Sequence, residues 1–139
     1  MNKELYDLTN PQKSIWLTEQ FYKGTSIENI TGSVSVLQNV DFGILKKSIN
    51  LFVKKNDSFR LKFTVKDSTV MQYVDKFTEF DIEIISVETD KDVKIIERKM
   101  CDTPFNTLDN FLFDFKLFKF PNGNGGFIIN AHHLISDAW

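Results

Sequence analysis

The chain has 139 residues, a formal net charge of −2 and 14 phenylalanines, which is enough length and apolar side-chain area for one folded domain with its own core. Its nearly balanced charge argues against a broad basic surface for nucleic acid, and its apolar runs are too short to span a membrane as helices. The first residues lack the apolar segment of a secretory signal, and the single cysteine, Cys101, fits a reducing compartment. We therefore expect a cytoplasmic protein. We also expect residues 1–139 to form one unit.

The first part of the chain predicts a helix, a strand and a second helix. Thr9 or Asn10 can cap a helix for which Pro11 is a suitable first residue. Residues 29–39 alternate in the way that is typical of a strand. Residues 41–55 carry apolar side chains at helical spacing, with lysines on the opposite side, and therefore predict an amphipathic helix.

The rest of the chain predicts five more strands and one more helix, residues 90–100. The strands are short β-rich runs bounded by turn residues: 59–65, 69–74, 80–87, 111–120 and 127–131. The first two and the last two are joined by short turns, so we expect each pair to form an antiparallel hairpin. Three helices and about six strands, without a strict βαβ order, predict an α/β fold of the sandwich type in which helices pack on a mixed sheet.

Both histidines of the chain stand together after the last predicted strand. His132 and His133 follow the apolar run 127–129, and Asp137 comes four residues after the second histidine. Histidine is the one side chain whose unperturbed pKa suits proton transfer near neutrality, so this stretch is the candidate catalytic site. One alternative is a hydrogen-bonded structural histidine. Another is a metal site made by His133 and Asp137, which lacks a third ligand because Cys101 is distant in sequence.

Arg60 lies among apolar neighbours where the second helix gives way to a strand. The residue types leave two interpretations open. The side chain can extend its charged end to water, or it can be the fixed cation of a partly buried ion pair.

Three stretches taken together resemble the condensation domains of nonribosomal peptide synthetases. The His-His-x-x-x-Asp-Gly motif of that family resembles residues 132–138, with Ala138 at the position of the glycine. The family's first motif resembles residues 8–16, and its second motif, which is built around an arginine, resembles residues 56–63. The stretches occur in the family's order, and the resemblance runs from the first of them to the end of the chain.

The resemblance implies a fold similar to chloramphenicol acetyltransferase, in which two lobes form a V with a tunnel between them. Residues 1–139 would be the N-terminal lobe, and a C-terminal lobe would follow it in a longer protein. The implied reaction joins an acyl or peptidyl thioester to the amine of an aminoacyl thioester. Both substrates would arrive on phosphopantetheine arms of carrier proteins, with no cofactor bound by this lobe itself.

The resemblance also implies roles for single residues. His133 would be catalytic, as a base or as a group that positions the amine, and His132 would support it. Asp137 would pair with Arg60, both in structural roles. Ala138 and Trp139 would lie near the thioester arm. The implied partners are carrier proteins and the C-terminal lobe, and an isolated lobe would self-associate through the apolar face that the second lobe covers.

Two alternatives to a condensing lobe stay open from the sequence. The alanine at position 138 motivates a catalytically idle lobe that docks carrier proteins. A free-standing acyltransferase of the chloramphenicol acetyltransferase kind is the other, and the first motif speaks against it. The acyl donor, the acceptor amino acid, and the choice between condensation and epimerisation subtypes are also open.

Overall fold

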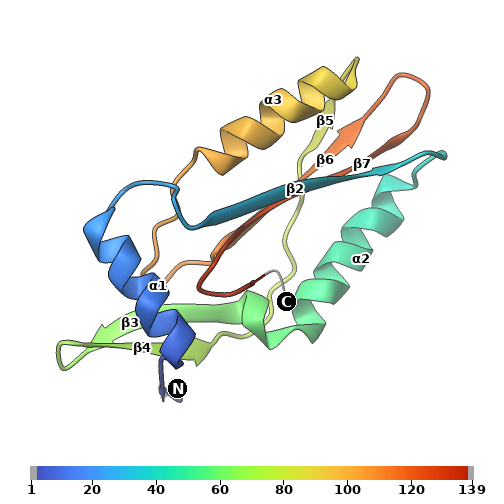
Figure 1. Ribbon diagram of the computed structural model, residues 1–139. Coiled ribbons are helices and arrows are strands. Elements are labelled where there is room, and N and C mark those ends of the chain that lie inside the picture. Colours follow the sequence, from blue (N-terminus) through green and yellow to red (C-terminus); the bar gives the residue numbers. More distant parts are fainter. Residues whose placement is uncertain (1–2, 138–139) are drawn as a thin grey trace.

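The computed structural model describes residues 3–137, which form two sheets and three α-helices (Figure 1). The helices are α1 (Asn10–Phe21), α2 (Phe42–Lys55) and α3 (Asp90–Cys101), and a short 3₁₀ helix, η1 (Asp57–Arg60), follows α2. The strands are β1 (Tyr6–Asp7), β2 (Asn29–Val36), β3 (Leu61–Lys66), β4 (Thr69–Val74), β5 (Ile84–Ser86), β6 (Phe113–Lys119) and β7 (Gly125–His132).

The larger sheet has the strand order β2-β7-β6-β5, and the smaller one has the order β1-β4-β3. β5 runs parallel to β6, while β7 is antiparallel to both β2 and β6. The larger sheet is therefore mixed, and the predicted α/β fold with helices packed on a mixed sheet is confirmed. Both predicted hairpins, β3 with β4 and β6 with β7, are confirmed as well.

Neighbouring residues of β6 serve two separate cores, because side chains on a strand alternate between its faces. Leu117 is fully buried in a cluster that includes Val53 of α2. Phe118, the next residue, is fully buried in a second cluster with Val93 of α3. The two helices thus cover opposite faces of the larger sheet, as Figure 1 shows.

The predicted helix starts are confirmed. Thr9 caps α1 in a reciprocal arrangement in which its hydroxyl accepts from the backbone N–H of Gln12, and the side chain of Gln12 accepts from the backbone N–H of Thr9. Asp41 caps α2 by accepting from the backbone N–H of Ile44 at 2.9 Å. None of the helices in residues 3–137 is long and apolar enough to cross a membrane.

Two predicted strands differ from the observed elements. Phe59 and Arg60 belong to η1, so the first hairpin begins only at Leu61. The strand expected over residues 80–87 is reduced to β5. The reason is that the backbone of Phe80 is held by a side chain: Phe80 N–H donates to Asn50 Oδ1 at 3.0 Å, and Asn50 Nδ2 donates to Phe80 O at 2.9 Å. An amide side chain of α2 thus takes the place of a neighbouring strand.

Candidate active site

β7 ends at the two histidines and places them in different surroundings. His132 is the last residue of the strand and is 1% exposed. His133, the first residue after the strand, is half-buried and lines a pocket on the surface. The supporting role implied for His132 and the catalytic role implied for His133 stay predictions, and the two residues differ in burial.

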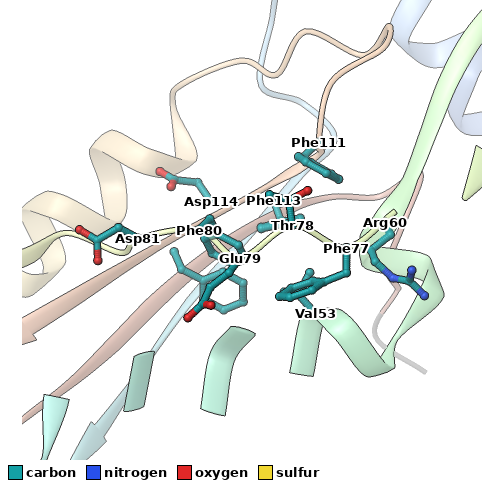
Figure 2. Close-up of a pocket in the computed structure, with 11 residues that line it drawn as sticks. Val53, Arg60, Phe77, Thr78, Glu79, Phe80, Asp81, Phe111, Phe113 and Asp114 are labelled. Carbon is teal, nitrogen blue, oxygen red and sulfur yellow. The ribbon is translucent and has the colours of Figure 1, made fainter. Parts of the chain in front are cut away.

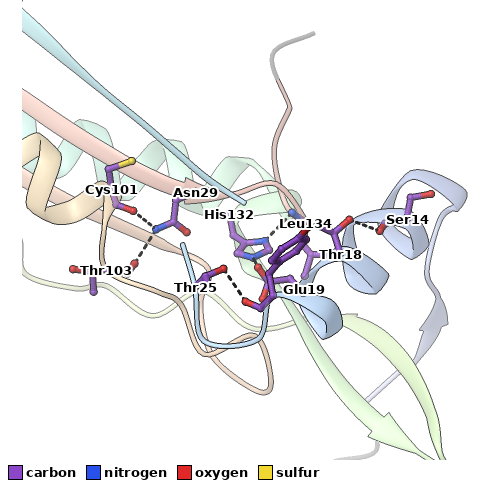
Figure 3. Close-up of polar contacts among 10 residues, drawn as sticks. Ser14, Thr18, Glu19, Thr25, Asn29, Cys101, Thr103, His132 and Leu134 are labelled. Atoms are coloured by element: carbon purple, nitrogen blue, oxygen red, sulfur yellow. Dashed lines mark hydrogen bonds and ion pairs between the residues drawn. The ribbon is translucent and has the colours of Figure 1, made fainter. Parts of the chain in front are cut away.

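The ring of His132 is held at both nitrogens (Figure 3). Nε2 lies 2.9 Å from Oε1 of Glu19 on α1, and Nδ1 lies 3.1 Å from the backbone nitrogen of Leu134. A backbone N–H can only donate, so Nδ1 accepts and carries no proton. The ring is therefore neutral, with its proton on Nε2 and donated to Glu19. Burial lowers the pKa of His132, and the hydrogen bond to Glu19 opposes that shift only in part.

The backbone around His133 is fixed by two further hydrogen bonds. The N–H of His133 donates to the carbonyl oxygen of Glu28 at 2.9 Å. The N–H of Ile135 donates to the carbonyl oxygen of His132 at 3.0 Å, which closes a tight turn. Both bonds hold the peptide group before His133, and the bond from the Leu134 N–H to His132 Nδ1 holds the one after it. The Cα position of His133 is therefore set by the frame rather than by its own side chain.

The segment that anchors His133 is itself tied to α3. Asn29 follows Glu28 in the chain and pairs with His132 in the β2–β7 register. Its side-chain nitrogen donates to the carbonyl oxygens of Cys101 and Thr103, each at 2.8 Å (Figure 3). The end of α3 and the end of β7 are therefore held together through one asparagine.

Gln12 connects α1 to the chain beyond the histidines. Its Nε2 donates to the carbonyl oxygen of Leu134 at 3.1 Å and to Oε1 of Gln72 at 2.8 Å. Its Oε1 accepts from the backbone N–H of Thr9 at 2.9 Å. One buried side chain thus caps α1, binds β4 and fixes the turn after His133.

The pocket beside His133 has a volume of about 360 Å³. Its walls come from three places: the start of α1, the junction of η1 with β3, and the chain after β7. The lining residues are Thr9, Pro11, Gln12, Ile15, Ser58, Leu61, His133, Leu134, Ile135, Ser136 and Asp137. The three stretches that carry the resemblance to condensation domains each contribute to this one pocket. An imidazole in such a pocket can accept a proton or a hydrogen bond from a bound amine.

Arg60 has two partners that lie close to it in the chain or on the neighbouring strand end. Its guanidinium forms an ion pair with Asp57, and its Nη1 donates to the carbonyl oxygen of Asp75 at 3.2 Å. The expected pair with Asp137 stays a prediction, and the ion pair that the structure shows for Arg60 is with Asp57. The reason is local: residues three apart lie on the same side of a 3₁₀ helix, so Asp57 is within reach as soon as η1 forms.

Asp137 lines the same pocket as His133. Its side chain is exposed. Its expected role in shaping the loop stays a prediction. Ala138 and Trp139, which we expect near a thioester arm, lie outside the described residues.

Glu19 is the site residue that the sequence-based reasoning missed. It is 6% exposed, although carboxylates are rarely buried. A signal was present in the sequence, because Glu19 follows Gln12 by seven residues and Ile15 by four, which puts all three on one side of α1. An acidic residue on the core-facing side of a helix indicates a buried partner, but not which one.

Comparison with known proteins agrees with this geometry. A family model described as Condensation domain matches residues 2–139. The chain belongs to the condensation domain family. It is 32% identical over 147 residues to surfactin synthase subunit 1 of Bacillus subtilis (strain 168), and 22% identical over 136 residues to bacitracin synthase 3 of Bacillus licheniformis. The two alignments cover 99% and 98% of this chain, but only 4% and 2% of those synthetases.

Solved condensation domains have the same fold. The starter condensation domain of rhizomide synthetase RzmA superposes with a TM-score of 0.87 at 19% sequence identity, over 97% of this chain and 34% of that one. The condensation domain of the monacolin K polyketide synthase MokA superposes with a TM-score of 0.82 at 16% identity, over 93% and 30%. The chain therefore spans about a third of the solved condensation domains that it matches.

This condensation-family chain has a second cavity, of about 330 Å³, on the α2 side of the larger sheet (Figure 2). Five phenylalanines and four charged residues are among its lining residues: Val53, Arg60, Phe77, Thr78, Glu79, Phe80, Asp81, Phe111, Phe113, Asp114 and Phe115. It shares no lining residue with the His133 pocket. Arg60 thus lines the aromatic cavity, and the pocket that Asp137 lines is a different one.

Proposed function

We propose that this chain is the N-terminal lobe of a condensation domain that forms an amide bond between two carrier-bound substrates. The amine nitrogen of an aminoacyl thioester attacks the carbonyl carbon of an acyl or peptidyl thioester. The C–S bond breaks, and the departing sulfur takes up a proton. His133 accepts the proton of the attacking nitrogen, or holds that nitrogen by a hydrogen bond.

One observation carries the proposal. His133 lines a surface pocket, whereas His132 is 1% exposed, and the backbone around His133 is fixed by hydrogen bonds to α1 and to the segment before β2. A reaction between two bound substrates needs the reacting atoms about 3–3.5 Å apart. A rigid frame around one accessible imidazole is suited to that requirement.

The names of the relatives are consistent with thioester substrates. The starter condensation domain of rhizomide synthetase, as the R148A variant, has been solved in complex with C8-CoA. We infer that the substrates of this chain also arrive as thioesters, on the phosphopantetheine arms of carrier proteins. The reaction would take place in the cytoplasm.

We further propose that this lobe does not catalyse condensation alone. A tunnel for two substrates needs walls on both sides, and a second, C-terminal lobe would supply the wall opposite His133. Without that lobe, exposed apolar side chains such as Phe21 (84% exposed) and Leu37 (86% exposed) are available for self-association.

The test compares four samples, each given two loaded carrier proteins. They are residues 1–139, the longer protein that carries them, and that protein with His133→Ala or with the control Gln20→Ala, an exposed residue of α1. We expect amide product from the longer protein and from the control. We expect none from residues 1–139 and a loss of at least about 100-fold in His133→Ala, which is the usual size of a general-base contribution.

Two results would contradict the proposal. Amide product from residues 1–139 alone would remove the need for a second lobe, and full activity in His133→Ala would remove the histidine from the chemistry. If the longer protein binds carriers without condensing them, the idle docking lobe becomes the better explanation. In that case Ala138→Gly, which restores the family's residue, should recover activity if the alanine is the cause.

A further inference from the structure

Glu19 is a buried carboxylate whose position costs stability in two ways. Its side chain is 8% exposed, and removal of a charge from water is unfavourable unless it is paired. It also lies near the C-terminal end of α1, where the helix dipole disfavours negative charge. Simple packing would favour an apolar residue at this place, so the carboxylate calls for another explanation.

The contact made by Glu19 decides which nitrogen of His132 carries the proton. A neutral imidazole has one donor and one acceptor nitrogen, and the two tautomers exchange these roles. Glu19 Oε1, at 2.9 Å from Nε2, is an acceptor and therefore keeps the proton on Nε2. That leaves the lone pair of Nδ1 free to accept the N–H of Leu134 at 3.1 Å.

The peptide that Nδ1 holds is the one that follows His133. The other tautomer would place an N–H of the ring against the N–H of Leu134, and a charged ring would do the same, so either state would break this bond. The carbonyl oxygen of the same residue, Leu134, is held by Gln12 of α1. Glu19 and Gln12 thus fix the two ends of one residue from one helix.

We propose that Glu19 is a positioning residue: by fixing the tautomer of His132 it holds the Leu134 amide, and through that amide it sets where the imidazole of His133 lies. The inference rests on the proposed function for its effect on catalysis. Its effect on the backbone does not depend on that function. Glu19 acts through His132 and does not line the His133 pocket.

The first measurement is backbone hydrogen exchange in the longer protein that carries this chain. With Glu19→Ala, the segment 132–136 should exchange at least about tenfold faster than in the wild type, because the Leu134 amide loses a defined acceptor. Gln20→Ala, an exposed neighbour on α1, should leave that segment unchanged. Unchanged exchange of this segment in folded Glu19→Ala would overturn the proposal.

The second measurement is the split between kcat and KM for amide formation. Glu19→Ala should lower kcat by about tenfold or more and leave KM within about twofold, because a displaced imidazole weakens the chemical step and leaves substrate binding intact. Glu19→Gln should recover kcat to within about threefold of the wild type, since its carbonyl oxygen still accepts from Nε2. A rise in KM with kcat unchanged would overturn the positioning role.

A third variant separates the effect of the position of the Glu19 carboxylate from the effect of its charge. It also replaces Glu19→Ala in the test if that variant does not fold. Glu19→Asp keeps the charge, but its side chain is one methylene shorter, so its oxygen lies further from His132 Nε2. Its kcat should therefore fall further than that of Glu19→Gln. The reverse order would show that the charge of Glu19 matters and its position does not. If the wild-type protein forms no amide, the proposed function fails, and hydrogen exchange of 132–136 in these variants still decides the role of Glu19.

Discussion

Gln12 and Leu134, 122 residues apart in the chain, are joined by a hydrogen bond of 3.1 Å from the side-chain Nε2 to the carbonyl oxygen. The other hydrogen on the same nitrogen goes to Gln72, and Oε1 is engaged by Thr9, so the polar atoms of the Gln12 amide are all satisfied. A satisfied buried amide of this kind specifies one arrangement of the elements that it joins. The start of α1 and the turn after the histidines are therefore held in one geometry.

The first prediction concerns that amide. Gln12→Ala strands the carbonyl oxygen of Leu134 and Oε1 of Gln72, and an unsatisfied buried group costs about 1–3 kcal/mol. We expect the free energy of unfolding to fall by about 2–4 kcal/mol in urea denaturation. Ser14→Ala, an exposed change on the same helix, should stay within about 0.5 kcal/mol of the wild type. Equal stability of the two variants would mean that the Gln12 amide adds no net stability to the fold.

Local patterns in the sequence predict most of the fold. The Thr9 cap of α1 needs only residues 9–12, and the β6–β7 hairpin needs only two apolar runs with a turn between them. Short-range signals of this kind can be recognised without knowing where the rest of the chain lies. The strand predicted over residues 80–87 is shorter in the structure, because the side chain of Asn50, on another element, forms hydrogen bonds with the backbone of Phe80.

The candidate site could be predicted only in part, for the same reason. The His132–His133 pair is visible because both residues stand together in the sequence. The carboxylate that orients His132 is 113 residues away, and residue types alone do not say which buried acid meets which histidine. For Arg60 the resemblance implies a distant partner, Asp137, whereas the structure shows an ion pair with Asp57, three residues away.

The second prediction concerns Gly126, near the start of β7, with Gly32 of β2 as the control. A Cβ added at Gly126 would lie 1.9 Å from the carbonyl oxygen of Val34 on β2, whereas one added at Gly32 would meet nothing within 4 Å. Gly126→Ala must therefore push apart the strands that carry the histidines, and overpacking of this kind costs about 1–3 kcal/mol. Gly32→Ala should be neutral or stabilise by up to about 1 kcal/mol.

Thermal unfolding of the two variants checks this prediction. The two glycines both lie within the paired β2–β7 register, so the loss of glycine flexibility in the unfolded chain is the same in both. A difference between them therefore reports how closely Val34 and the ring of Phe118 approach Gly126. Equal melting temperatures would show that β2 and β7 can separate at little cost.

The third prediction concerns the partner of Arg60. Asp57 is 71% exposed, and exposed ion pairs contribute about 0–1 kcal/mol. A double-mutant cycle with Arg60→Met and Asp57→Ala should give a coupling energy of about 0.5–1 kcal/mol. Methionine keeps an apolar stem in the place of the one that lines the aromatic cavity. The coupling energy from the cycle therefore reports the interaction between the two charges rather than a loss of packing.

A second cycle, Arg60→Met with Asp137→Asn, serves as the comparison. Removing one member of a buried ion pair typically costs about 3–5 kcal/mol. We expect a smaller coupling here than with Asp57. A coupling several times larger would instead support the pair that the family resemblance implies.

The last prediction concerns the stability of the chain between about pH 7 and pH 5.5. Burial lowers the pKa of His132 below its usual value of about 6.5, against the opposing effects of Glu19 and Glu28 and with a small contribution from His133 in the same direction as burial. In this range the unfolded chain binds a proton at residue 132 that the folded chain excludes. Stability is therefore complete above the unfolded pKa and falls as the pH is lowered through that range, by at most about 1.4 kcal/mol per pH unit for one proton.

Urea denaturation at a series of pH values measures this slope, and two variants assign it. His132→Asn should flatten the slope, because asparagine does not titrate while its Oδ1 can still accept from the Leu134 N–H. His133→Ala should leave most of the slope in place, because the buried ring of His132 is still present in that variant. A slope that survives His132→Asn would mean that another group carries it. A stability that rises towards pH 5.5 would mean that the buried ring is charged in the folded state. Nδ1 would then carry a proton, and the hydrogen bond from Leu134 that orients the turn could not form.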